Sequence, residues 1–299
     1  MKSKKFIIVL VLILFVALTS IALVQAKNVE EPPTVDAGQI VYDGKTLTNS
    51  SYKKAFPALS PDKQQIAFVY NIYADEEGQP VRKIGLVDVK SGQVTDIKLE
   101  NNSSTGFLYL EWLKNNRIGV ISHINPSLEE YDIIDATSGI QTEQHFGVGF
   151  SWLGDRLYFN KPRPHFADGD KGKNKIMDDK GGILYESPDN VMIIGGPNFD
   201  EQGKSVAFFE YDTLNEEVTL VVGDHLNDKS IKINKKMKWH SDIGRVKWDN
   251  ANEVKIGSQY HIVKFNLDSE QIVGDEKTPE AIKLEQEFEQ RHSDNFYDK

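Results

Sequence analysis

The stretch that decides the fold is LVDVKSGQVT at residues 86–95, where an apolar run meets a tight polar turn and a new strand begins. Two close copies follow, IIDATSGIQ at 133–141 and IMDDKGGILY at 176–185, with a weaker copy, KFNLDSEQIV, at 264–273 and a degraded one around Val222-Gly223-Asp224. Residues 88, 135, 178, 223 and 266 are equivalent, so successive copies lie 47, 43, 45 and 43 residues apart. Runs of β-branched residues favour strands, whereas Asp, Ser and Gly favour the turns between them.

A second repeated feature lies upstream of each turn. An apolar or aromatic residue precedes a short polar turn and a new apolar strand, at Leu59, Trp112, Trp152, Phe199 and Trp248. Each unit is therefore predicted to hold four antiparallel strands in 43–47 residues, which is typical of one β-propeller blade. We predict an all-β fold, with a β-propeller of about five four-stranded blades at residues 39–275.

Both ends of this region carry a further prediction. Residues 39–42, QIVY, are predicted to close the propeller by pairing beside the last blade. After Thr278-Pro279 the pattern changes to a thin apolar stripe among acidic residues. Thr as N-cap and Pro at the first helical position predict a short helix within a C-terminal tail at 276–299.

The stretch FPALSPDKQQIAF at residues 56–68 resembles the SPDG-type repeat of TolB-like or WD40-like β-propellers. A partial match occurs at Trp152-Leu153-Gly154-Asp155 and at residues 198–204, NFDEQGK. The resemblance implies the fold and not an activity. Such repeats occur in periplasmic adaptors, in the propeller domains of prolyl-oligopeptidase-like enzymes and in stand-alone binding proteins.

The first residues indicate export. Lys2, Lys4 and Lys5 precede Phe6–Val24, a run of 19 residues without a charge. Residues 1–26 are either a signal peptide cleaved after Val24-Gln25-Ala26 or a retained membrane anchor. The lysines are expected to stay in the cytoplasm in both cases. The rest of the chain, which begins with a polar linker at 27–38, is then extracytoplasmic, either secreted or anchored to the cell membrane.

The composition excludes some classes of function. The chain has no cysteine, so the exported domain has neither a cysteine-linked lipid nor a disulfide. An exported chain without cysteine is typical of a bacterial product. A formal net charge of −10 disfavours a nucleic-acid partner, because phosphate binding is driven mainly by Lys and Arg. Hydrophobic residues make up 39% of the chain, which is enough for an ordinary core.

Two motifs suggest chemistry and are given structural interpretations. Asp168, Asp170 and Asn174 alternate as in a calcium loop, but Gly172 stands where a central ligand is expected, and three neighbouring lysines oppose a cation. Residues 149–153, GFSWL, nearly match a nucleophile elbow but lack its final glycine, and Ser151 falls in a strand of the repeat. We predict no catalytic residues, no metal site and no cofactor, and a prolyl-oligopeptidase-type enzyme is excluded because no hydrolase domain accompanies the propeller.

The loops between second and third strands are predicted to be long, at 71–83, 123–131, 160–174 and 210–217. Loops on a rigid scaffold concentrate function, although these loops are equally explained as tolerated insertions. The predicted binding face comprises Tyr73, Arg82, Asn125, Glu129, Arg163, His165, Asp168, Asp170, Tyr211 and Asp212.

The sequence thus predicts a non-catalytic binding or scaffold module for a protein, a peptide or a cell-envelope polymer. One alternative is a small secreted hydrolase or lyase whose active site lies at the channel mouth. Another is an anchor that stays in the membrane through residues 6–24 and reports to a membrane complex.

Overall fold

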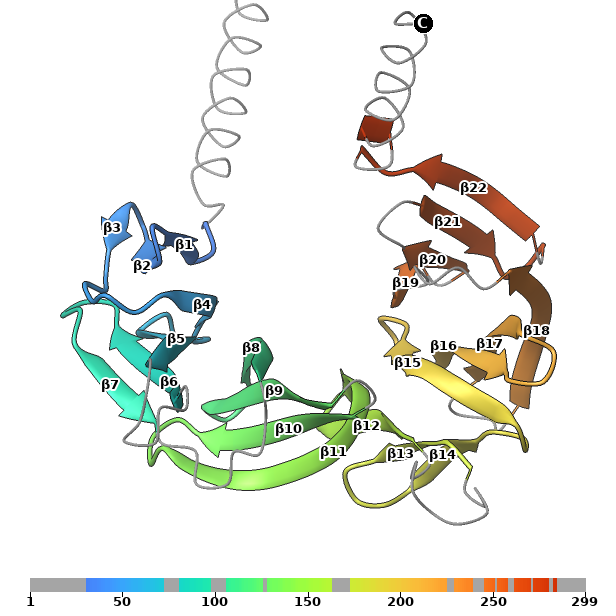
Figure 1. Ribbon diagram of the computed structural model, residues 1–299, viewed down its shortest axis with the longest axis horizontal. Helices are drawn as coiled ribbons and strands as arrows, with labels where there is room; N and C mark the ends of the chain where they lie inside the picture. Colours follow the sequence, from blue (N-terminus) through green and yellow to red (C-terminus); the bar gives the residue numbers. More distant parts are fainter. Residues whose placement is uncertain are drawn as a thin grey trace, which may run out of the picture. The chain divides into compact units, whose positions relative to one another are not determined.

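The computed structural model of the chain describes residues 31–72, 81–97, 106–125, 128–162, 173–224, 229–238, 245–250, 252–257, 261–269, 271–279 and 282–283 (Figure 1). Its elements are β-strands, and three residues, Pro279, Ile282 and Lys283, are helical. Most of the predicted C-terminal helix therefore lies outside the described residues, as do residues 1–30.

The chain divides into two compact units. The first comprises the described residues within 31–102, 107–120 and 133–142. The second comprises those within 103–106, 121–132 and 143–283.

The first unit begins with a small sheet in the order β1-β2-β3, with bounds Thr34–Asp36, Gln39–Tyr42 and Lys45–Thr46. Because β1 and β3 occupy both edges of β2, residues 39–42 do not have a free edge for the pairing predicted beside the last blade. Ile40 and Tyr42 of β2 instead pack against Ile66, Phe68 and Val87.

The next sheet is antiparallel, in the order β4-β5-β6-β7. Its strands are Lys54–Leu59, Gln65–Ile72, Val81–Asp88 and Val94–Ile97. Alternate residues of β5 face two cores, since Ala67 and Val69 pack with Ile84 and Leu86 while Ile66 and its even-numbered neighbours pack on β2. This alternation is the period of two that a strand buried on both faces shows.

A seven-stranded sheet follows, in the order β14-β13-β12-β11-β10-β9-β8. Its strands are Gly106–Leu113, Arg117–Asn125, Leu128–Asp135, Ile140–Leu153, Arg156–Lys161, Lys175–Asp178 and Ile183–Glu186. The sequence predicts separate strands near Ile140 and Trp152, but β11 is one strand of 14 residues that belongs to both neighbouring repeats. It is irregular between Val148 and Ser151, where the pairing with β12 shifts.

The second unit continues with two antiparallel sheets, in the orders β15-β16-β17-β18 and β19-β20-β21-β22. The strands of the former are Val191–Phe199, Ser205–Asp212, Glu217–Asp224 and Lys229–Lys238. Those of the latter are Arg245–Asn250, Glu253–Gly257, His261–Asn266 and Gln271–Lys277. Their shared core includes Ala207, Phe209, Leu220, Val254 and Phe265.

The predicted tight turns are confirmed at the ends of β6, β10 and β13. Asp88, Asp135 and Asp178 end these strands, and each carboxylate accepts hydrogen bonds from backbone N–H groups of the turn. Gly92, Gly139 and Gly181 follow at positive φ, between +68° and +87°, a conformation that glycine adopts without strain. The three clearest copies of the repeat are therefore Asp-capped turns after β6, β10 and β13.

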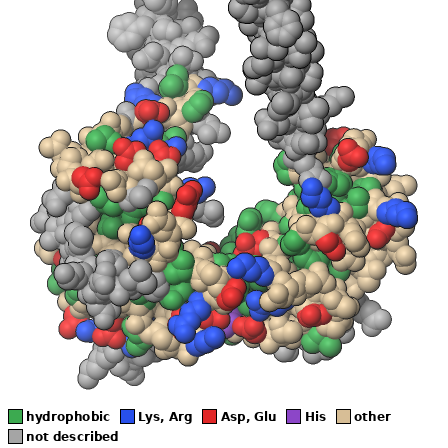
Figure 2. All heavy atoms as spheres, turned by 180° about the vertical axis from the view of Figure 1, so that it is seen from behind, with side chains coloured by type: hydrophobic (Ala, Val, Ile, Leu, Met, Phe, Trp, Pro, Cys, Tyr) green, Lys and Arg blue, Asp and Glu red, His purple; other side chains and the backbone are tan. Residues whose placement is uncertain are grey.

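On the face drawn in Figure 2, acidic and basic side chains are interspersed over the described surface. Mixed charges of this kind favour solubility. The described part of the chain contains no helix with the length and apolar character needed to span a membrane.

Candidate functional site

A polar cluster on β10 and β11, within the second unit, contains two buried carboxyl groups, those of Glu130 and Asp132. Strand β10 presents Glu130 and Asp132 on one face and Glu129 and Tyr131 on the other, because side chains alternate along a strand. The neighbouring strand β11 supplies Gln144 and further polar side chains.

Glu130 and Asp132 form a buried carboxyl pair. Their exposed fractions are 0% and 1%. The Gln144 amide donates to a Glu130 carboxylate oxygen and, at 3.3 Å, to Asp132 Oδ1. Burial, and secondarily the charge of Glu130, raises the pKa of Asp132 from 3.8 to about 7. Near neutral pH the pair therefore holds a proton that an exposed carboxyl group would have lost.

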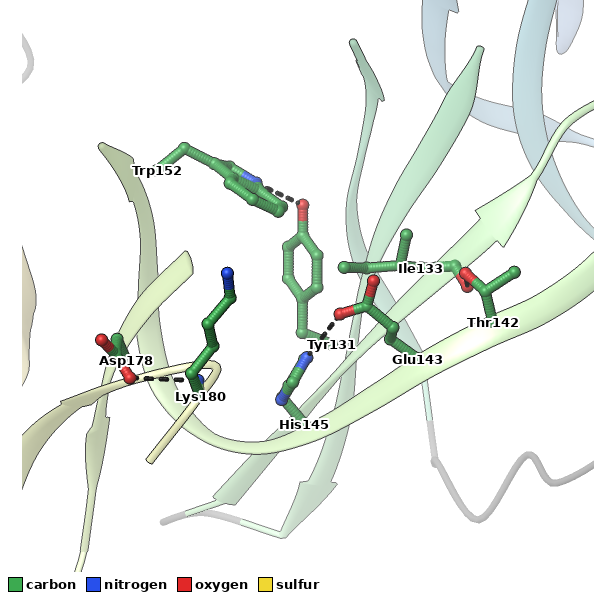
Figure 3. A network of polar contacts seen from close by, with 8 residues as sticks. All are labelled: Tyr131, Ile133, Thr142, Glu143, His145, Trp152, Asp178 and Lys180. Carbon is green, nitrogen blue, oxygen red and sulfur yellow. Dashed lines mark hydrogen bonds and ion pairs between the residues drawn. The ribbon is translucent and has the colours of Figure 1, made fainter. Parts of the chain in front are cut away.

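The opposite face of β10 holds the irregular part of β11. Glu129 Oε2 accepts a hydrogen bond from the backbone N–H of Gly149 at 3.2 Å. Tyr131 Oη accepts one from Trp152 Nε1 at 2.9 Å, and Figure 3 shows the indole pointing at this hydroxyl. The ring of Tyr131 also lies 5.1 Å from that of Phe150. These contacts fix the course of β11 at its bulge.

Glu143 and His145 form the part of the cluster that solvent reaches. Their Oε2 and Nε2 atoms are 3.4 Å apart, and their side chains are 39% and 15% exposed (Figure 3). The His145 ring lies 5.8 Å from that of Phe159, which restricts its orientation. A carboxylate that orients an imidazole supplies the orienting group and the base of a catalytic triad, whose third member is a nucleophile.

Ser151 does not complete such a triad as a nucleophile elbow. It lies in β11, where it pairs with Tyr158, and not at a turn between a strand and a helix. The glycine of the elbow-like motif has a packing role, since a Cβ at Gly149 would lie 2.1 Å from the nitrogen of Gly196.

Half of the predicted binding-face residues can be placed. Arg82 lies in β6, Asn125 ends β9, Glu129 lies in β10, and Tyr211 and Asp212 end β16. The connections predicted at 123–131 and 210–217 are shorter than expected, because β9 extends to Asn125 and β10 begins at Leu128, while β16 extends to Asp212 and β17 begins at Glu217. The remaining five, Tyr73, Arg163, His165, Asp168 and Asp170, lie outside the described residues.

The placed residues of β16 have structural contacts. Asp212 Oδ1 accepts hydrogen bonds from the backbone N–H groups of Leu214 and Asn215, at 2.8 and 3.1 Å, and so caps the turn. Tyr211 packs against the core of the last two sheets. The sequence pattern thus places the start of this connection too early, because polar and aromatic residues also occur at the end of a strand.

Within the described residues, no group of three or more His, Asp or Glu side chains could hold a metal ion. The calcium-like loop lies outside these residues apart from its last two positions, 173 and 174. Asn174 is buried there, and its amide donates to Val191 O at 3.3 Å.

No protein-family model matches the chain. No curated protein sequence matches it.

Solved structures are similar in fold. Dipeptidyl peptidase 4 from Porphyromonas gingivalis matches 81% of this chain at 11% identity and a TM-score of 0.57, and this match covers 43% of the peptidase. A puromycin-hydrolysing peptidase from Mycobacterium tuberculosis matches 82% at 13% identity and a TM-score of 0.50, with 44% of that chain covered. The β-propeller domain of the Trilobed protease from Pyrococcus furiosus matches 83% of both chains at 14% identity, with a TM-score of 0.48.

At such identities the likeness shows the fold alone, and that fold is the β-propeller. The chain spans less than half the length of the two peptidases that it matches with a TM-score of 0.50 or more. The prediction of a non-catalytic binding or scaffold module is wrong, because these structural neighbours are propeller-bearing peptidases. The lack of a hydrolase domain in the sequence does not test whether the propeller acts together with a peptidase.

Proposed function

We propose that this chain is a peptidase-associated β-propeller that acts in the hydrolysis of peptides. The likeness to dipeptidyl peptidase 4 over 81% of the chain carries the proposal. The puromycin-hydrolysing peptidase, which acts on a substrate of a different kind by its name, supports hydrolysis as the common element.

In this proposal the propeller has five blades. They are the sheets β4–β7, β8–β11, β11–β14, β15–β18 and β19–β22, with β11 shared by the second and third. The resemblance of residues 56–68 to TolB-like repeats supports this arrangement, as does the spacing of the Asp-capped turns. The chain acts outside the cytoplasm, because Lys2, Lys4 and Lys5 precede the apolar run Phe6–Val24.

The groups that break the peptide bond come from a hydrolase unit that associates with the propeller. Glu130 and Asp132 are too buried to touch a substrate. The accessible pair Glu143–His145 has an orienting carboxylate and an imidazole. Ser151 is held in a strand, so it does not complete this pair as a nucleophile elbow would. We therefore assign to the propeller the admission and positioning of the peptide.

The test is to isolate the tagged chain from its producing cells under mild conditions and assay fluorogenic aminoacyl and dipeptidyl substrates. A fluorophosphonate probe that labels serine hydrolases is added in parallel. We expect the isolated complex to hydrolyse peptides and to contain a protein that the probe labels. Both should be missing from a control isolation without the tagged propeller. Absence of both hydrolysis and label would contradict the proposal.

The alternative of a hydrolase with its own channel-mouth site predicts a different outcome. The purified chain alone would then hydrolyse the substrates, and His145→Gln would abolish the activity. The matched control is His123→Gln, on β9, which is expected to leave hydrolysis unchanged because His123 does not belong to the Glu143–His145 pair.

A further inference from the structure

The buried carboxyl pair joins two adjacent strands at one point. Glu130 and Asp132 are two residues apart on the same face of β10. Gln144 on β11 donates to both. A side-chain amide nitrogen carries two N–H groups, so this single side chain serves both carboxyl groups across the strand boundary.

Two charges on this pair would be costly. Carboxylates that share a buried site repel one another, and one of them keeps its proton to relieve the repulsion. A protonated carboxyl group can also donate a hydrogen bond, which an ionised one cannot do. The arrangement thus favours one proton on the pair in the closed sheet.

Further titratable groups lie on the neighbouring strands of the same sheet. The strands next to β10 carry Arg117 and His123 on β9, and Glu143 and His145 on β11. The charge that acts on the pKa of Asp132 comes from Glu130, and its effect is second to burial. Glu129 and Tyr131, on the other face of β10, contact Gly149 and Trp152 instead.

We propose that the Glu130–Asp132–Gln144 cluster is a pH-sensitive latch between β10 and β11. With a proton on Asp132 the strands are held together, and its loss loosens them. Because Glu129 and Tyr131 extend from the same strand to the bulge of β11, loosening of β10 releases these contacts too. The latch would make the joint between two repeats tighter in mildly acidic surroundings than in neutral ones.

The direction of the pH dependence follows from linkage. The pKa of Asp132 is about 7 in the folded chain and 3.8 in the ordinary, exposed state. Between these values the closed form binds more protons than the open form, so the closed form loses stability as pH rises. The opening equilibrium constant should grow by up to about tenfold per pH unit in this window and level off above pH 7.

Hydrogen exchange of the backbone amides of β10 and β11 tests the latch. Exchange is measured from pH 5 to pH 8 and corrected for the intrinsic effect of pH. We expect protection in these strands to fall between pH 5 and pH 7 and then to stay constant. The Asp132→Asn variant should remove this fall, whereas the control Glu143→Gln, in the solvent-exposed pair on β11, should retain it.

A second variant covers the case that Asp132→Asn does not fold. Glu130→Gln removes the charge that contributes to the raised pKa of Asp132, so the fall in protection should move to lower pH. Protection that is independent of pH in the wild-type chain would overturn the proposal. So would an unchanged pH dependence in Asp132→Asn, or in Glu130→Gln.

Discussion

At the scale of single residues, glycine decides how closely two strands approach. A Cβ at Gly149 would lie 2.1 Å from Gly196 N, and one at Gly196 would lie 1.6 Å from Gly149 O. Gly149 also has a φ of +64°, which costs other residues about 1–2 kcal/mol. Backbone contact thus requires glycine at 149 and at 196, and the positive φ of Gly149 favours glycine there as well.

We expect Gly149→Ala to lower the free energy of unfolding by about 3 kcal/mol or more, because strain at positive φ adds to a backbone clash. The matched control is Gly154→Ala. Gly154 has a similar φ of +62° but open space around it, so its loss should be about 1 kcal/mol. Urea unfolding followed by tryptophan fluorescence measures both, and equal losses would show that the contact with Gly196 is unimportant.

Local residue roles could be predicted from the sequence where the cause is local. Asp88 and Gly92 form a turn within five residues, and their pattern is sufficient to find it. The convergence of Asp132 with Gln144, and of Gly149 with Gly196, depends on strand pairing and sheet packing. Neither contact leaves a short motif, which is why the carboxyl pair was missed.

At the scale of elements, three tryptophans of the repeat form hydrogen bonds with the repeat that precedes them in the chain. Trp112 Nε1 donates to Ala58 O at 2.6 Å, and Trp248 Nε1 donates to Asn198 O at 2.9 Å. Trp152 reaches the hydroxyl of Tyr131. The sequence predicts that these residues precede a turn, and the structure adds that their indole N–H groups are hydrogen-bonded between repeats.

A double-mutant cycle on Trp152→Phe and Tyr131→Phe tests this role. Each variant retains a ring and removes one partner of the hydrogen bond, so their effects on the free energy of unfolding should be non-additive. We expect a coupling of about 0.5–1.5 kcal/mol. Trp248→Phe combined with Tyr131→Phe is the control, because Trp248 bonds to Asn198 and the two effects should add. Additive effects in the first cycle would exclude the connection.

Strand ends were easier to predict than strand continuity. The turns after β6, β10 and β13 carry strong signals, whereas residues 141–145 of β11, QTEQH, are polar and do not indicate that the strand continues. These residues extend as a strand because their partners are polar too, as Gln144 and Glu130 illustrate. Hydrophobic periodicity cannot detect a strand whose side chains pair with polar groups.

At the scale of the whole molecule, the repeat determines the class of fold but not the function of the protein. The same architecture carries many unrelated functions, so the propeller by itself did not distinguish a binding module from a part of a peptidase. The solved structures that resemble this chain are peptidases, but at 11–13% identity the likeness shows the fold alone. The resemblance to TolB-like repeats stays a prediction.

The last prediction concerns the side of the membrane on which the chain acts. Lys2, Lys4 and Lys5 should keep the N-terminus in the cytoplasm while the propeller is exported, with or without cleavage after Ala26. Protease added to intact protoplasts should then degrade an anchored propeller, whereas a cleaved chain should appear in the medium with Lys27 as its first residue. Replacement of the three lysines by glutamate should reduce both products, because it removes the charge that orients the apolar run. A chain that stays protected inside wild-type protoplasts would contradict export, and it would also separate the propeller from any extracytoplasmic peptidase.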